Sequence, residues 1–275
     1  MTGFADRLAA RVEARRSQVV VGLDPDPARV PGGAAGAVAF CRDVIAAAAP
    51  HCVAAKIQIA CFERLGADGW AAWEKVAADA ADAGLLVIAD AKRGDIDATS
   101  RAYAQAFLHP PVDALTVNPM LGGDAVAPFL DAAREGGTGL FMLVRTSNPG
   151  AADLQDLPLA DGRPWHEAVA GLVAGWGGPL TGECGLSGVG AVVGATVPGR
   201  VARLRALMPD QPFLLPGVGA QGGDASSLGA AFGGRAAGAL VSASRSIIYA
   251  DDPGAAAAAL RDEVWAAWEA APPQG

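Results

Sequence analysis

The most informative stretch of the sequence is Leu85-Leu86-Val87-Ile88-Ala89-Asp90-Ala91-Lys92-Arg93-Gly94-Asp95. Its apolar first half has the length and composition of a buried strand. Side chains alternate between the two faces of a strand, so we expect Asp90 and Lys92 to point the same way and lie side by side. Such a pair is also a common surface ion pair, and the motif alone leaves a structural and a catalytic role equally open.

The same unit recurs eight times along the chain: an apolar run that ends in Gly, Asp, Asn or Ser, then a longer segment with helical spacing. The predicted strands and the last helix lie near 19–24, 52–58, 85–90, 113–118, 139–145, 188–194, 213–217, 238–244 and 254–270. This alternation favours a parallel sheet. Because no Gly-x-Gly-x-x-Gly turn follows the first strand, we predict a single (β/α)8 TIM barrel over residues 1–275 rather than an open doubly wound sheet.

Composition narrows the class of protein. Of 275 residues, 52% are hydrophobic and 18% charged, enough for a sizeable core. The net charge of -8 argues against nucleic-acid binding, which needs concentrated basic surface. The amino terminus lacks the pattern of a secretory signal, and apolar runs are broken by charge, Gly or Pro before bilayer length. We therefore expect a soluble cytoplasmic protein without a membrane or nucleic-acid partner.

The sequence offers no clustered metal ligands. Cys41, Cys52, Cys61 and Cys184 have no paired short spacing and are predicted to be free thiols in the core. The three histidines are scattered along the chain. An anionic ligand would therefore rely on local lysine or arginine side chains.

Polar residues follow most of the predicted strands, at the end where barrels of this kind carry their sites. They are Asp24, Lys56, Gln58, Asp90, Lys92, Asn118, Ser147 and Thr196. Any one of them could cap a helix or solvate a loop, and Asp and Asn are favoured at turns. Their equivalent positions nevertheless predict one shared site.

Two further segments suggest ligand binding. The glycine-rich turn 216–224 precedes a helix, and Arg245 follows the last strand. Backbone N–H groups, a helix start and an arginine fork are typical of a phosphate site. The long loop 146–163 is predicted to be an active-site lid, with a passive surface loop as the alternative.

Taken in order, these motifs resemble the orotidine 5'-phosphate decarboxylases over nearly the whole chain. The resemblance rests on Gly22-Leu23-Asp24-Pro25, Lys56, the Asp-x-Lys-x-x-Asp pattern at 90–95, the glycine-rich turn with Gln221, and Arg245. The segment Arg145-Thr146-Ser147-Asn148-Pro149-Gly150 resembles the longer bacterial (type 2) branch. The resemblance implies decarboxylation of orotidine 5'-phosphate to UMP and CO2, the last step of de novo pyrimidine synthesis, without metal or organic cofactor.

The resemblance also implies roles for single residues. Lys92 would be the proton donor, Asp90 would lie against the substrate carboxylate, and Lys56 would hold Asp90. Asp95 and Thr99 would reach the partner's site in a homodimer. The remaining substrate contacts would be Asp24 to the ribose, Ser147 to the pyrimidine edge, and Gln221 and Arg245 to the phosphate.

Two other functions remain open on the sequence. A sugar-phosphate decarboxylase or aldose-forming synthase shares the Asp-x-Lys-x-x-Asp pattern but uses magnesium to stabilise an enediolate. A non-catalytic barrel could instead sense UMP or a similar phosphate. The set of Lys56, Asp90, Lys92 and Asp95 argues against the second, because binding alone does not require it.

Overall fold

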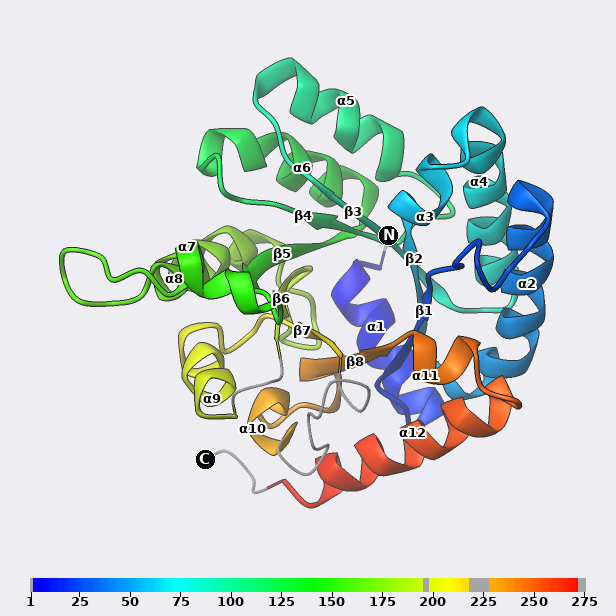
Figure 1. Ribbon diagram of the computed structural model, residues 1–275. Coiled ribbons are helices and arrows are strands. Elements are labelled where there is room, and N and C mark those ends of the chain that lie inside the picture. Colours follow the sequence, from blue (N-terminus) through cyan, green and yellow to red (C-terminus); the bar gives the residue numbers. More distant parts are fainter. Residues whose placement is uncertain (1, 195–197, 218–227, 272–275) are drawn as a thin grey trace.

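The computed structural model of the protein describes residues 2–194, 198–217 and 228–271. Eight parallel strands close into a barrel in which each strand pairs with its neighbours in sequence (Figure 1). The strands are β1 Val19–Leu23, β2 Ala54–Gln58, β3 Leu86–Arg93, β4 Ala114–Val117, β5 Gly139–Arg145, β6 Val189–Val193, β7 Phe213–Pro216 and β8 Ala239–Ala243. The predicted barrel is confirmed, and the main difference is that β3 continues to Arg93.

Helices surround the strands on the outside of the barrel (Figure 1). The longer ones are α2 Gly33–Ala48, α4 Gly66–Asp82, α5 Asp97–Phe107, α6 Gly123–Gly136, α8 Trp165–Gly177, α9 Pro198–Leu207 and α12 Pro253–Glu269, while α1 Phe4–Arg15 lies at the amino-terminal end of the barrel. Short helical turns lie in the connections: α3 Ile59–Glu63, α7 Ala152–Gln155, α10 Gly229–Phe232, α11 Arg245–Ile248, η1 Ala49–His51, η2 Pro149–Ala151, η3 Gly178–Leu180 and η5 Ala236–Gly238. The apolar face of each longer helix packs on the strands, as its spacing requires.

Helix α1 precedes the first strand and closes the amino-terminal end of the barrel. Its Phe4, Leu8 and Val12 are buried among inward-facing side chains of the strands. The ring of Phe4 meets that of Phe141 edge to face, with centroids 5.9 Å apart. A Cβ at Gly139 would lie 2.2 Å from the Phe4 ring, so this strand position requires glycine. The carboxyl end of the barrel is therefore left for a ligand.

One helical stretch, Gly33–His51, is long and apolar enough to cross a membrane by length and composition alone. This differs from the expectation that every apolar run is interrupted earlier. The stretch packs as a barrel helix, because α2 buries Cys41 and Val44 in the core. Its Arg42 pairs with Asp79 of α4 at 2.9 Å. The stretch is therefore one of the helices that cover the barrel.

The four cysteines are free thiols, as predicted. Burial raises the pKa of the Cys41 and Cys52 thiols to about 12, which keeps them protonated and unreactive. Cys184 is exposed, so the prediction of a core position is wrong there. It follows η3 in a surface connection, where its amide donates to Asp6.

Candidate active site

Strands β2 and β3 bring charged side chains of alternating sign together at the carboxyl end of the barrel. Lys56 and Asp90 are buried, with the Lys56 Nζ 2.6 Å from Oδ2 of Asp90. The Lys92 Nζ lies 2.5 Å from the other oxygen, Oδ1. Oδ1 of Asp24, after β1, lies 3.8 Å from the Lys56 Nζ. We call these four residues the charged array.

Within the charged array, ion pairing affects the pKa values of Lys56 and Asp90 more than burial does. Burial would raise the pKa of Asp90, but the charges of Lys56 and Lys92 hold it well below its ordinary value. Burial would likewise lower the pKa of Lys56, but Asp90 and Asp24 hold it above its ordinary value. Lys56 and Asp90 are therefore both ionised at neutral pH, which makes the array a fixed pattern of charge.

The backbone at Lys92 is unusual for a strand. Its φ of 47° lies in the left-handed region, and the β3–β4 register shifts between Ala89 and Arg93. Close packing continues at Gly94, where a Cβ would lie 2.6 Å from the carbonyl oxygen of Asn118. Strained backbone of this kind persists where the surrounding structure holds it, and it concentrates at functional sites.

Two neutral side chains complete the hydrogen bonding of Asp90. The Thr116 hydroxyl on β4 donates to Oδ1 at 3.0 Å and accepts the Lys92 backbone N–H at 2.9 Å. Gln58 Nε2 donates to Oδ2 at 3.2 Å. Gln58 was predicted at this end of the barrel, whereas Thr116 was not. The one sequence feature that could have identified Thr116 is its hydroxyl within the otherwise apolar run Ala114–Val117.

Asp95 and Thr99 lie apart from the array of their own chain. The Asp95 carboxylate accepts a hydrogen bond from the Ile96 amide at 2.8 Å, and the Ser100 hydroxyl donates to its carbonyl. Thr99 is exposed on α5. Within the described part of the chain, neither side chain forms an ion pair or hydrogen bond with the array.

Two of the remaining predicted substrate contacts, Ser147 and Arg245, lie at the same end of the barrel. Ser147 follows β5 and is half-buried; a Cβ on Gly194 would lie 3.0 Å from its backbone nitrogen, so the ends of β5 and β6 approach closely. Arg245 is exposed at the start of α11, directly after β8. Gln221 and Thr196 lie outside the described residues, as does most of the glycine-rich turn.

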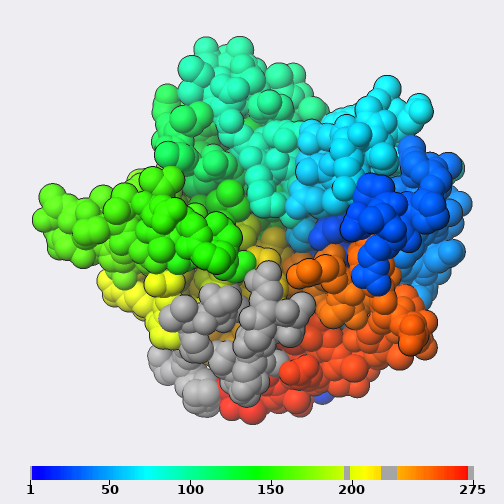
Figure 2. Space-filling model, viewed as in Figure 1, coloured from blue at the N-terminus to red at the C-terminus, as the bar shows by residue number. Residues whose placement is uncertain are grey.

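The face at the carboxyl ends of the strands is hollowed at its centre. Figure 2 shows the hollow between the segments that follow β1, β3, β5 and β8. In the portion of the chain that the structure describes, no group of three or more His, Cys, Asp or Glu side chains is placed to hold a metal ion. The arrangement offers preorganised charge and an ammonium group as a proton source.

The predicted lid loop contains short helical turns and a hairpin. After β5 the chain forms η2 and α7, then a small hairpin closed by a bridge between Pro158 and Pro164. The hairpin projects outward from the barrel (Figure 1). The part from Thr146 to Asp156 remains next to the barrel end, where side-chain contacts hold it.

Fold and site together define a (β/α)8 barrel with a charged site at the carboxyl ends of its strands, the position used by barrel enzymes. Residues 17–260 match the family described as "Orotidine 5'-phosphate decarboxylase / HUMPS family". The chain belongs to this family.

Individual relatives agree over most of the chain. A protein of Halorubrum lacusprofundi named orotidine 5'-phosphate decarboxylase is 48% identical over 228 residues, which cover 82% of this chain and 78% of the relative. One of the same name from Deinococcus radiodurans is 46% identical over 274 residues, 95% of this chain and 96% of the relative. The solved Leishmania donovani OMP decarboxylase is 39% identical, with a TM-score of 0.82, and covers 98% of this chain and 100% of that one.

Proposed function

We propose that the protein decarboxylates orotidine 5'-phosphate to UMP and CO2, the last step of de novo pyrimidine synthesis. The observation that carries the proposal is the charged array of Asp24, Lys56, Asp90 and Lys92 at the carboxyl end of the barrel, in a chain of this family. The named relatives support the same reaction. The proposed reaction needs neither a metal ion nor an organic cofactor.

The chemistry explains why such an array suits this substrate. Loss of CO2 leaves negative charge on a pyrimidine ring carbon that has no adjacent electron sink. The protein must therefore remove a barrier of order 20 kcal/mol largely by electrostatics and orientation. Lys92 is the proposed proton donor to that carbon, and its ammonium stabilises the developing charge. Its side chain is 43% exposed beside the buried Asp90, so a ligand in the hollow can reach it.

Asp90 is proposed to face the substrate carboxylate. Like-charge repulsion there is relieved as CO2 leaves. Lys56, Gln58 and Thr116 keep Asp90 in one position through the contacts described above. Because these residues lie on strands, little reorganisation accompanies the reaction.

The sites are proposed to lie at the interface of a homodimer, with Asp95 and Thr99 reaching the partner's site. In support, neither side chain contacts the array of its own chain among the described residues, and the neighbouring Ile96 is 57% exposed. A groove of about 600 Å³ runs between α5 and α6 beside Ile96, on the same side of the barrel.

Subunit mixing tests the shared site. Lys92→Ala and Asp95→Ala subunits should each be inactive alone. After a 1:1 mixture exchanges subunits, half of the dimers are hybrids and one of their two sites has both residues intact, so activity should recover to about a quarter of wild type. Activity of Asp95→Ala alone, or no recovery despite subunit exchange seen by mass spectrometry, would contradict the shared site.

The other substrate contacts extend outward from the array. Asp24 is proposed to accept hydrogen bonds from ribose hydroxyls, since its buried Oδ1 accepts none from the described residues. Ser147 is proposed to contact the pyrimidine edge, and Gln221 and Arg245 the phosphate, with loop 146–163 as a lid. A cytoplasmic location also belongs to the proposal, in keeping with the free thiols.

The direct test is conversion of orotidine 5'-phosphate to UMP, followed by ultraviolet absorbance in excess chelator, for wild type and Lys92→Ala. We expect metal-independent turnover that is lost in the variant. If folded wild type gives no turnover, the magnesium-dependent sugar-phosphate function becomes the leading alternative. If Lys92→Ala retains full turnover, the assigned proton donor is wrong.

A further inference from the structure

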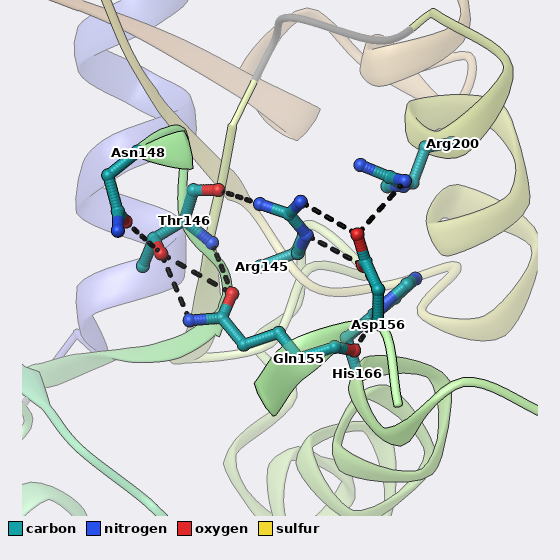
Figure 3. Close-up of polar contacts among 7 residues, drawn as sticks. All are labelled: Arg145, Thr146, Asn148, Gln155, Asp156, His166 and Arg200. Carbon is teal, nitrogen blue, oxygen red and sulfur yellow. Dashed lines mark hydrogen bonds and ion pairs between the residues drawn. The ribbon is translucent and has the colours of Figure 1, made fainter. Parts of the chain in front are cut away.

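A second cluster of polar side chains lies at the end of β5, and the catalytic proposal does not use it. Figure 3 shows its members. They are Arg145, Thr146, Asn148, Gln155, Asp156, His166 and Arg200. We call this group the loop clamp, because it joins the two ends of the segment between Thr146 and Asp156.

The carboxylate of Asp156 is the centre of the loop clamp. Arg145 grips it with two nitrogens, Nε to Oδ1 and Nη2 to Oδ2, both at 2.9 Å. Arg200 of α9 approaches Oδ2 at 3.4 Å, and Nδ1 of His166 lies 3.2 Å from Oδ1. The hydrogen bonds from Arg145 hold the pKa of Asp156 below its usual range. Arg145 and His166 are buried, so the arrangement is part of the packed structure.

The neighbouring Gln155 holds the start of the same segment. Its Oε1 accepts the Thr146 backbone N–H at 2.8 Å, and its Nε2 donates to the Thr146 hydroxyl at 3.0 Å. That hydroxyl donates in turn to Oδ1 of Asn148 at 2.7 Å. The carbonyl of Gln155 lies 2.7 Å from Nδ1 of His166. Helix α8, which carries His166, therefore also holds Gln155 in place.

These contacts have a direct consequence for Ser147. Its two neighbours, Thr146 and Asn148, are both tied to the loop clamp, and its backbone lies against Gly194 after β6. Ser147 itself has no hydrogen bond to another described side chain, which leaves its hydroxyl for a ligand. The position of Ser147 is therefore set by contacts within the loop clamp and by the close approach of Gly194.

The loop clamp also joins separate barrel units. Arg145 lies on β5, His166 on α8 and Arg200 on α9, and Asp156 touches all three. A second contact between the helices, the two-nitrogen grip of Arg203 on Glu167 at 3.1 and 2.8 Å, fixes α9 against α8. A carboxylate shared by three elements defines their relative position more tightly than apolar packing does, since its hydrogen bonds are directional.

We propose that Asp156 is a positioning residue for the reaction, which places Ser147 against the pyrimidine through Arg145 and Thr146. This inference rests on the proposed function and extends it to residues outside the charged array. Displacement of a substrate-contacting group by about 1 Å can lower an enzymatic rate about a hundredfold. The effect of Asp156 should therefore exceed that of an ordinary loop residue.

The first test compares Asp156→Asn with Asp262→Asn as a control. Asp262 lies on α12, away from the charged array and the proposed lid, and among the described residues it also pairs with an arginine, Arg261 at 2.7 Å. We expect kcat/KM for orotidine 5'-phosphate to fall about 10- to 100-fold in Asp156→Asn and to stay within about twofold in the control. Equal, small effects of the two variants would overturn the inference.

A double-mutant cycle separates positioning from a purely structural role. If Asp156 acts through Ser147, the double variant Asp156→Asn/Ser147→Ala should lose no more kcat/KM than Ser147→Ala alone. Losses that multiply would show that Asp156 acts independently of Ser147 and would overturn the inference. If Asp156→Asn unfolds, as seen by circular dichroism, Arg145→Lys in place of Asp156→Asn gives the same cycle, because it weakens the same ion pair from its other side.

Wild-type turnover in the same assay keeps the two proposals distinct. If wild type turns over and the cycle is multiplicative, only the positioning role is wrong. If folded wild type does not turn over, the proposed function is wrong, and the positioning role falls with it.

Discussion

Asp90 and Asp156 are both carboxylates set between two cations near the carboxyl end of the barrel, but they differ in their partners. Asp90 lies between Lys56 and Lys92, on rigid strands. Asp156 lies between Arg145 and Arg200, at the end of a loop. Lysine supplies a compact charge and a transferable proton, whereas arginine supplies a planar fork and keeps its protons. The lysine pairing of Asp90 therefore suits proton transfer, and the arginine pairing of Asp156 suits holding a loop in one conformation.

The largest effect is expected when lysine and arginine are exchanged at the two sites. Lys92→Arg keeps the charge but removes the transferable proton, so turnover should fall at least about a thousandfold. Arg145→Lys keeps the charge but loses the fork, so kcat/KM should fall only about tenfold. Steady-state assays of both variants check this. Comparable losses in the two would mean that the transferable proton and the planar fork do not distinguish the two sites.

The next largest effect should be on stability, through Asp90→Asn. The change leaves the buried Lys56 without its main counter-charge, so the free energy of unfolding should fall by about 3 kcal/mol at neutral pH, as measured with urea. Because paired Asp90 has a depressed pKa in the folded state, its contribution is present above its unfolded pKa of about 3.9 and lost as pH falls toward the folded pKa.

The stability difference between wild type and Asp90→Asn should therefore shrink as pH drops below about 4. Urea titrations of both proteins at pH 7, 5 and 3.5 provide the comparison. A difference that stays constant over this range would mean that the ionised Asp90 does not stabilise the fold.

Thr116→Val should have a smaller effect on the same carboxylate. The substitution keeps the side-chain shape but removes one hydrogen bond to Asp90 and one from the Lys92 amide. We expect a loss of about 1 kcal/mol in the free energy of unfolding, and kcat about tenfold lower, because Asp90 and Lys92 are less well held. An unchanged kcat in the steady-state assay would show that Thr116 is not needed to position Asp90.

The smallest effect should come from Arg200→Gln in the loop clamp. Arg200 is partly exposed and 3.4 Å from Asp156, whereas Arg145 already grips both oxygens. The free energy of unfolding should change by less than about 0.5 kcal/mol, and kcat/KM by less than about twofold. A loss as large as that of Arg145→Lys would show that α9 takes a greater part in holding the loop than the distances indicate.

Local sequence patterns were enough to predict the barrel. The run 85–90 has a strand's composition and ends in polar residues, and its repetition with helical segments between fixes the topology, since parallel strands need crossovers. The same alternation placed Asp90 and Lys92 on one face, and the structure brings them to 2.5 Å. The roles of the site residues stay predictions, and Gln221 lies outside the described residues.

Sequence by itself therefore determined which elements form and which charged residues reach the carboxyl end of the barrel, because both follow from local periodicity. Tertiary structure alone decided the partners across strands and loops. Thr116 meets Asp90 only because β4 pairs with β3 across a register shift, and Asp156 meets Arg145 only because the intervening loop folds back. Such contacts join residues on different elements, whose register and packing angle no local pattern specifies.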